Sequence, residues 1–319
     1  MTLELVRTPP MPRQLDRAKW HKPLVSIIVT HHNYSDHLED ALLSLLDQTH
    51  ENWECVVVDD GSDNTHRAIA DLTVHTIAEA RIRFHPLEAN RGQIPAFFAG
   101  LEATAGEFVC ALDPDDRYAR DFLEEMLAAH LNRIRCVPLV SCEQMFLRGD
   151  QVISGVVTGH AGKLLAEDNR VGRVVLPELR FFPAASEKWH WSSTSGMMFR
   201  RPVLNAIRPH RAFDYRGDLD AYAAPGAHML GGSMFLNKTL LYRGLHSAND
   251  WQREDFWSQG QRTQFPCRGA KVRADVIEAI IANGYEADLA RAKHGKRTLP
   301  QRLRRSIAKR WRRLRGGTQ

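Results

Sequence analysis

Three carboxylates within four residues are the strongest chemical signal in this sequence. Asp113, Asp115 and Asp116 flank Pro114 and directly follow the apolar run 107–112. Ionised carboxylates this close together repel one another unless a cation or hydrogen-bond donors lie among them. Mg²⁺ or Mn²⁺ suits such a cluster, because hard divalent ions prefer oxygen ligands and share their coordination with substrate phosphates. An acidic turn capped by Asp113 is the alternative interpretation.

A second acidic pair, Asp59 and Asp60, ends the apolar run 55–58. Gly61 permits a left-handed turn after it, and Ser62 or Asp63 can cap a following helix. One carboxylate of the pair is then free to accept a hydrogen bond from a nucleobase imide or a ribose hydroxyl. The spacing alone does not separate this role from a structural turn.

The segments around these residues alternate between predicted strands and helices. Short apolar runs at 24–30, 55–58, 82–85 and 107–112 predict strands, and apolar residues at helical spacing predict helices over 38–46 and 94–103. Such alternation indicates a mostly parallel sheet with right-handed crossovers. Because ligands bind at the carboxyl ends of parallel strands, we expect residues 30–33, 59–60 and 113–116 to converge at one edge.

The second half of the chain is less regular. Residues 137–146 and 151–158 have the character of strands, 189–199 are aromatic and rich in Ser and Thr, and 261–290 have helical spacing. We therefore divide the chain into an N-terminal arm (1–22), a nucleotide-sugar-binding half (23–135), an acceptor-binding half (136–260) and a helical extension with a basic tail (261–319).

Four motifs in order resemble family 2 glycosyltransferases. They are VSIIVTHHN at 25–33, LLDQT at 45–49, VVVDDGS at 56–62 and GEFVCALDPDD at 106–116. The resemblance covers residues 23–131. It implies the GT-A fold, a Rossmann-like and mostly parallel α/β sheet flanked by helices, here with a C-terminal helical extension. It also implies an inverting transfer from a nucleotide-diphospho-sugar, for which we expect a UDP-linked donor, to a hydroxyl acceptor.

The resemblance assigns roles to particular residues. It places the nucleobase beside Thr30, His32 and Asn33, and it makes Asp60 the carboxylate that recognises the base. It makes Asp113, Asp115 and Asp116 the DxD-type motif, which contacts the ribose and binds Mn²⁺ or Mg²⁺ on the pyrophosphate. Downstream, His246 is a further candidate metal ligand, with a buried structural histidine as the alternative, and His246 or Arg243 is a candidate contact to the pyrophosphate.

Two departures from the family pattern affect these assignments. Asn90 and Gly92 fit the Asn-x-Gly loop of the family, but Phe97 occupies the position of an expected arginine, and we expect Arg91 to replace it. In the second half, Gly217 replaces the first residue of the acidic pair that supplies the base. Asp218 is then the candidate base and Asp220 the reserve, with a helix N-cap as the structural alternative for Asp218.

The net charge of +5 is unevenly distributed. Residues 291–319 contain twelve basic and no acidic residues, so the first 290 residues carry an excess of seven acidic ones. This distribution argues against a nucleic-acid-binding body. Leu303, Ile307, Trp311 and Leu314 form a narrow apolar seam, so 299–315 suit either an interfacial helix on an anionic membrane surface or a solvated tail.

Other features bear on where the protein works. The five cysteines show no CxxC or metal-type spacing, which favours buried reduced thiols, and no run of residues is long and apolar enough for a signal peptide or a membrane span. We therefore expect a cytoplasmic protein, with peripheral attachment to the inner face of the cell membrane as an option.

The leading hypothesis is a metal-dependent glycosyltransferase that acts on a glycan or lipid-linked acceptor in cell-surface polysaccharide or glycolipid synthesis. A nucleotidyltransferase is the first alternative, because it would use a similar sheet and acidic site. However, it predicts a glycine-rich basic loop after the first strand, where this chain has His31, His32 and Asn33. A catalytically inactive binding module is the second alternative, suggested by Phe97 and Gly217.

Overall fold

The computed structural model describes residues 22–132, 135–154, 179–186, 189, 191–211, 219–246 and 265–293. The predictions for residues 1–21, for Asp218 and for the tail at 299–315 lie outside these ranges.

One mixed sheet organises the molecule. Its first part is parallel, in the order β3-β2-β1-β4, and comprises β1 (Val25–His31), β2 (Trp53–Asp59), β3 (Ile82–Pro86) and β4 (Phe108–Leu112). All four predicted strands are confirmed. The expected α/β class is confirmed with them.

The sheet continues through strands from the second half of the sequence. β9 (Met197–Arg200) is antiparallel to both β4 and β6 (Leu139–Arg148), and β10 (Ser233–Gly244) runs parallel to β6. Three shorter antiparallel strands complete it: β5 (Asp116–Tyr118) and β8 (Leu179–Phe182) on β10, and β7 (Gln151–Ser154) on β6. Strands of both predicted halves therefore form a single sheet.

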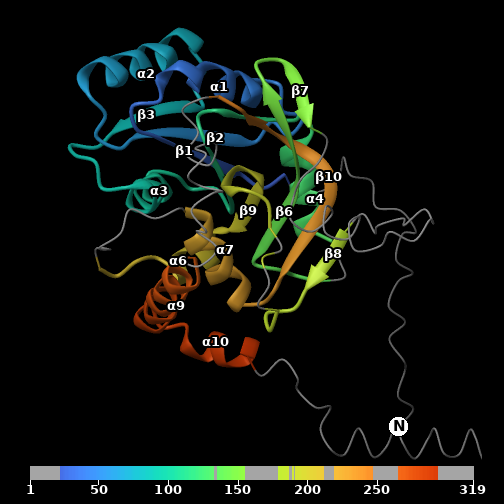
Figure 1. The fold of residues 1–319 in the computed structure, drawn as a ribbon. Helices are drawn as coiled ribbons and strands as arrows, with labels where there is room; N and C mark the ends of the chain where they lie inside the picture. The colour runs from blue at the N-terminus through green and yellow to red at the C-terminus, as the bar shows by residue number, and fades with distance from the viewer. Residues whose placement is uncertain are drawn as a thin grey trace, which may run out of the picture.

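Helices cover both faces of this sheet (Figure 1). Alternate residues of a strand point to opposite faces, so Ile27 packs with one layer and Ile28 with the other. The first layer contains α1 (Leu38–Leu46), α2 (Asn64–Ile77) and α4 (Phe122–His130). The second contains α3 (Gln93–Glu102), α6 (Arg201–Ala206), α7 (Leu219–Met229), α9 (Phe265–Ala282) and α10 (Glu286–Lys293).

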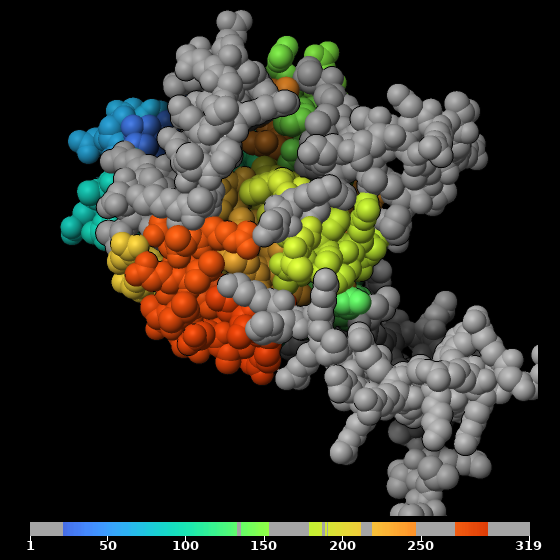
Figure 2. All heavy atoms as spheres, turned by 60° about the horizontal axis from the view of Figure 1, so that its bottom comes forward, coloured from blue at the N-terminus to red at the C-terminus, as the bar shows by residue number. Residues whose placement is uncertain are grey.

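The predicted helical extension belongs to the second layer. Val276 and Ile280 of α9 are fully buried and pack in the same cluster as Tyr222 of α7. Figure 2 shows α9 and α10 in orange and red, forming a broad face beside residues 179–211. The predicted helical character of 261–290 is thus confirmed by α9 and by α10, which extends to Lys293. Both helices contribute to the core that packs against α7.

The cysteine prediction is confirmed in part. Cys55, Cys110 and Cys142 are buried free thiols, but Cys136 is exposed and lies in the irregular stretch between α4 and β6. Among the described residues, no helix combines the length and apolar character needed to cross a bilayer.

Candidate active site

The carboxyl ends of three neighbouring strands meet at one edge of the sheet. His31 of β1 is in register with Asp59 of β2, and Val29 of β1 is in register with Leu112, the last residue of β4. The polar residues that follow these strands therefore lie together, as the sequence predicted.

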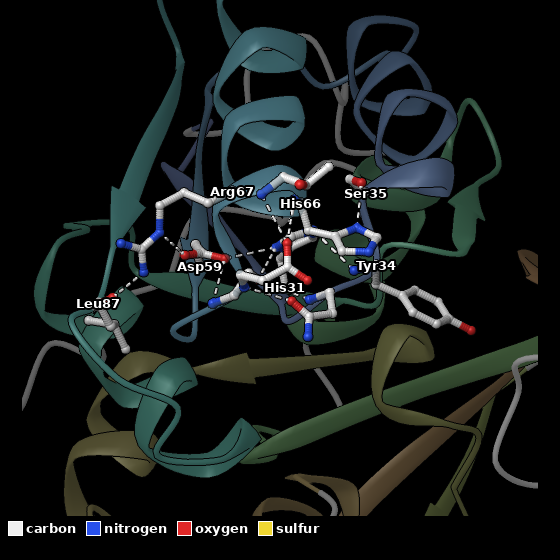
Figure 3. A network of polar contacts seen from close by, with 11 residues as sticks. His31, Tyr34, Ser35, Asp59, His66, Arg67 and Leu87 are labelled. Atoms are coloured by element: carbon white, nitrogen blue, oxygen red, sulfur yellow. Dashed lines mark hydrogen bonds and ion pairs between the residues drawn. The ribbon is translucent and has the colours of Figure 1, made fainter.

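A buried network joins β1, β2 and α2 at this edge (Figure 3). His31 Nδ1 lies 3.1 Å from Asp59 Oδ1, and Arg67 Nε donates to Asp59 Oδ2 at 2.8 Å. Burial alone would raise the pKa of Asp59, but hydrogen bonds from Ser62, Arg67 and His31 hold it below its ordinary value. Arg67 also donates to the carbonyl of Leu87 at 2.6 Å. Asp59 is therefore the structural member of the Asp59–Asp60 pair.

The same network fixes the loop after β1. Since Nδ1 of His31 faces a carboxylate, it carries the proton, and Nε2 accepts from the backbone nitrogen of Tyr34 at 3.3 Å. Burial lowers the pKa of His31, which keeps this neutral form. Asn33 has a φ of 53° and its side-chain oxygen accepts from Asp63 N at 2.9 Å. Asn33 thus stabilises the loop, while the side chain of His32 is exposed.

Asp60 is buried and holds the neighbouring loop by its backbone. Its two carboxylate oxygens accept from the backbone nitrogens of Arg91 at 2.8 Å and Gly92 at 2.7 Å. The side chain of Arg91 is exposed. Within the described residues, the buried side-chain oxygen of Asn90 has no hydrogen-bond partner.

The acidic loop after β4 is held by the second half of the chain. The hydroxyl of Ser195 donates to Asp116 Oδ2 at 2.6 Å and accepts from the backbone nitrogen of Asp113 at 3.0 Å. The backbone nitrogen of Gly244 donates to Asp116 Oδ1 at 3.2 Å. Asp116 is therefore turned toward β10 and residue 195, and β5, which the sequence did not predict, starts at Asp116 and pairs with β10.

Burial and, after it, mutual repulsion perturb the ionisation of these carboxylates. Burial, followed by the charges of Asp116 and Asp115, raises the pKa of Asp113 well above its ordinary value. Burial and Asp115 likewise raise the pKa of Asp116 to about 7, although the cation of Arg243 opposes this shift. The electrostatic conflict expected from the sequence is thus present in the fold.

His246 brings the end of β10 to the acidic loop. Its Nε2 lies 3.2 Å from Asp115 Oδ2 and 2.8 Å from the hydroxyl of Tyr34, and the ring of His37 stacks on it at a centroid distance of 4.3 Å. The residue pair Asp115 and His246, predicted as metal ligands from opposite halves of the sequence, is therefore in contact. The aromatic and imidazole rings beside it come from the segment that follows β1.

The chain offers a partial coordination shell for a divalent cation. Among the residues that the structure describes, no three His, Cys, Asp or Glu side chains are arranged to hold a metal ion, and Asp115 and His246 are in contact with each other. Ser195 and Gly244 hold the carboxylate of Asp116. Two protein ligands beside carboxylates of raised pKa nevertheless fit Mg²⁺ or Mn²⁺, which shares its coordination with substrate phosphates.

The helix that carries a candidate base faces the same loop. Asp220 lies in the first turn of α7, close enough to Asp113 for its charge to raise the pKa of that residue. Gln93, the first residue of α3, links the two elements: its Nε2 donates to Asp113 Oδ1 at 3.0 Å, and its Oε1 accepts from the backbone nitrogen of Leu219 at 2.9 Å. The other candidate base, Asp218, lies outside the described residues.

Some residues of the site carry no distinctive local signal. Ser195 follows Ser192, Ser193 and Thr194, and nothing in that run singles it out. The amide of Gln93 contacts residues 20 and 126 positions away, which only the fold can reveal.

The chain is similar in sequence to known glycosyltransferases. Residues 26–150 match the family described as glycosyl transferase family 2. An uncharacterized glycosyltransferase of Nostoc sp. is 28% identical over 277 residues, which cover 86% of this chain and 81% of that protein. The UDP-Glc:alpha-D-GlcNAc-diphosphoundecaprenol beta-1,3-glucosyltransferase WfgD of Escherichia coli is 32% identical over 109 residues, 34% of this chain and 41% of WfgD.

The fold also matches a solved structure. The mannosyltransferase PcManGT from Pyrobaculum calidifontis, in complex with GDP-Man and Mn²⁺, superposes with a TM-score of 0.56 and 18% identity. The superposition covers 91% of this chain and 81% of PcManGT. By its motifs and these similarities, residues 26–150 form a glycosyl transferase family 2 domain, and the chain is a glycosyltransferase with the GT-A fold.

Proposed function

We propose that this protein is an inverting glycosyltransferase that moves a sugar from a UDP-sugar to a hydroxyl group of a cell-surface glycan or its lipid-linked precursor. The observation that carries the proposal is the convergence of Asp113, Asp115 and His246 with the first turn of α7, where Asp220 lies. A diphosphate-binding acidic loop and a candidate base thus face each other across one site.

The donor end of the site is the edge formed by β1, β2 and the 90–92 loop. The buried side-chain oxygen of Asn90 supports a contact to the base or ribose. Asp60 sits beside it and orders the loop, and each of its oxygens keeps a second lone pair for a donor group of the nucleotide. The UDP-glucose specificity in the name of WfgD supports a uridine donor here.

Asp115 and His246 are the residues that would hold Mn²⁺ or Mg²⁺. The bound cation would supply positive charge to the departing diphosphate. Arg243 adds a second positive charge near the loop, since its Nε lies 3.9 Å from Asp116 Oδ2. The Mn²⁺ in the PcManGT complex supports this part of the proposal at the level of the fold.

The base is proposed on α7. A carboxylate of Asp218 or Asp220 accepts the proton of the acceptor hydroxyl as its oxygen attacks the anomeric carbon from the side opposite the diphosphate. Because the attack is in line, the configuration at the anomeric carbon inverts. A positioned base of this kind contributes about 10²–10⁴-fold to the rate.

The acceptor and the place of action follow from the relatives. WfgD, by its name, glycosylates a sugar on diphosphoundecaprenol, so we propose an acceptor of that class and a cytoplasmic enzyme that works at the inner face of the cell membrane. The basic segment 299–315 would attach it to anionic lipid. Co-sedimentation with vesicles containing phosphatidylglycerol tests the attachment. If a chain truncated after residue 298 sediments with the vesicles to the same extent as the full chain, the attachment through 299–315 is refuted.

The activity is tested with a panel of UDP-, GDP- and dTDP-sugars, Mn²⁺, and sugar-diphospholipid acceptors. We expect turnover with one UDP-sugar, complete loss with EDTA, and a product whose anomeric configuration by NMR is opposite to that of the donor. A retained configuration would refute the inverting mechanism. Preference for another nucleotide would refute the uridine assignment.

Matched variants test the residue roles. We expect Asp115→Asn to lose about 100-fold or more in kcat/KM, since a direct ligand matters at least as much as an outer-shell partner. Either Asp218→Asn or Asp220→Asn should lower kcat by about 10²–10⁴-fold. Asp71→Asn, on the outer helix α2, is the control and should leave activity unchanged. Wild-type protein that binds UDP and Mn²⁺ without turnover would favour the binding-module alternative. Transfer of a nucleotidyl group would favour the nucleotidyltransferase alternative.

A further inference from the structure

Gln93 occupies a junction between two helix N-termini and the acidic loop. It is the first residue of α3, follows the N-cap Gly92, and lies partly buried. Its amide nitrogen donates to Asp113 Oδ1 at 3.0 Å and its amide oxygen accepts from Leu219 N at 2.9 Å. Leu219 begins the described part of α7. The side chain of Gln93 therefore links the acidic loop after β4 to helix α7.

Only one orientation of the amide satisfies both contacts. A backbone N–H can only donate, so the oxygen of Gln93 must face Leu219, and the NH₂ group must then face Asp113. The first turn of a helix has backbone N–H groups without intrahelical partners, and the Gln93 oxygen satisfies one of them. The NH₂ group in turn gives the crowded Asp113 carboxylate a donor that carries no charge.

We propose that Gln93 is a positioning residue that sets the distance between the donor-binding Asp113 and the first turn of α7. This inference rests on the proposed function, because it assumes that Asp113 contacts the donor and that α7 carries the base. The side chain holds the two elements, which belong to opposite halves of the sequence, in one fixed arrangement. Donor binding and proton removal thereby depend on the same amide.

No other common side chain reproduces both contacts. Glutamate keeps an oxygen for Leu219 but places a carboxylate against Asp113, whereas methionine matches the length of glutamine and loses both hydrogen bonds. Substitution by these two residues therefore separates the two ends of the bridge.

Gln48 is a matched control elsewhere in the fold. Its side-chain oxygen accepts from the first-turn nitrogen of Leu123 in α4 at 3.0 Å, and its NH₂ group donates to the carbonyls of Ala119 at 2.8 Å and Ser44 at 3.0 Å. The bridge has the same form but ends on neutral backbone carbonyls instead of a carboxylate. Gln48→Met should therefore reduce stability without changing the kinetics.

The experiment combines hydrogen exchange with steady-state kinetics on the full chain. In Gln93→Met we expect amide exchange in peptides beginning at residue 219 to quicken about fivefold or more, as for a lost helix cap. In Gln93→Glu the exchange should stay within about twofold of wild type. Gln48→Met should quicken exchange in α4 but leave α7 unchanged.

The kinetic readout divides in the same way. Gln93→Glu should raise the donor KM about 10- to 100-fold, the range for a lost hydrogen bond to a charged group, with a smaller effect on kcat. Gln93→Met should also lower kcat, because the base-bearing turn is released. Titration with UDP and Mn²⁺ by calorimetry should show the same weakening as the KM values.

The outcomes separate this inference from the proposed function. If wild type transfers sugar and Gln93→Met matches Gln48→Met in both exchange and kinetics, the positioning role is wrong while the function stands. If wild type transfers no sugar, the proposed function fails, and the exchange of α7 still decides whether Gln93 holds that helix. Unchanged exchange in Gln93→Met overturns the bridge in either case.

Discussion

Replacing Ser195 by alanine should damage the acidic loop more than an equivalent change one strand away. The Ser195 hydroxyl is fully buried, donates to the carboxylate of Asp116 at 2.6 Å and accepts from the backbone nitrogen of Asp113 at 3.0 Å. Ser141 is also fully buried, accepts from the backbone nitrogen of Ser192 at 2.9 Å and shares a 2.7 Å hydrogen bond with its hydroxyl. The two sites differ mainly in the charge of one partner.

That difference sets the magnitude. A hydrogen bond to a charged group contributes about 1.5–3 kcal/mol and a neutral one about 0.5–1.5 kcal/mol. We therefore expect Ser195→Ala to lower the free energy of unfolding by about 3 kcal/mol and Ser141→Ala by about 2 kcal/mol. The comparison belongs at pH 8, because the pKa of Asp116 is raised to about 7 and its carboxyl group must be ionised.

Urea unfolding at pH 8, with a common slope for all variants, measures the stabilities. Steady-state kinetics should show kcat/KM falling about tenfold or more in Ser195→Ala, equivalent to about 1.4 kcal/mol, and within about twofold of wild type in Ser141→Ala. Equal losses of stability together with unchanged kcat/KM in both variants would refute the reasoning. Ser195 would then be an ordinary buried hydroxyl.

Two further predictions concern the stability of the fold at low pH and the 90–92 loop. Burial lowers the pKa of His130 from 6.5 to about 3, so its neutral form stabilises the fold fully above pH 6.5, and this contribution is lost as the pH falls from 6.5 toward 3. Between pH 7 and pH 5 the loss is about 2 kcal/mol in urea unfolding, and His130→Gln should show a correspondingly smaller difference between the two pH values. Gly61 has a φ of +66°, and a Cβ there would overlap the backbone of Asn90. Gly61→Ala should therefore weaken UDP binding and reduce thermal stability. Gly149→Ala, at φ +59° with open space around it, should cost only the conformational strain of about 1–2 kcal/mol. Equal effects of the two glycine variants on stability and UDP binding would contradict the overlap.

Much of the first half of the fold follows from local patterns. Short β-branched runs separated by segments of helical spacing predicted four strands of a parallel sheet, and β1 to β4 lie where these runs are. Because parallel strands end at the same edge, the sequence also predicted that the acidic pair and the acidic loop would meet. The antiparallel insertion of β9 next to β4 could not be predicted, since β9 is only four residues long and its partners are distant in sequence.

Only the tertiary structure distinguishes the roles of adjacent acidic residues. Asp59 and Asp60 are chemically identical neighbours, but the first is buried against Arg67 and His31, whereas the second holds the backbone of the 90–92 loop. Alternation along the strand sends neighbouring side chains in different directions, and only the packed elements on each side decide what each one meets.

By itself, the sequence determined the family, the fold class and the acidic loop that begins at Asp113, because these depend on residue types at short spacing. The tertiary structure alone decided how that loop is held: Ser195, Gln93 and His246 reach it from 82, 20 and 131 residues away. Such contacts have no local pattern, since a single hydroxyl, amide or imidazole becomes specific only when folding places it against a crowded group of carboxylates.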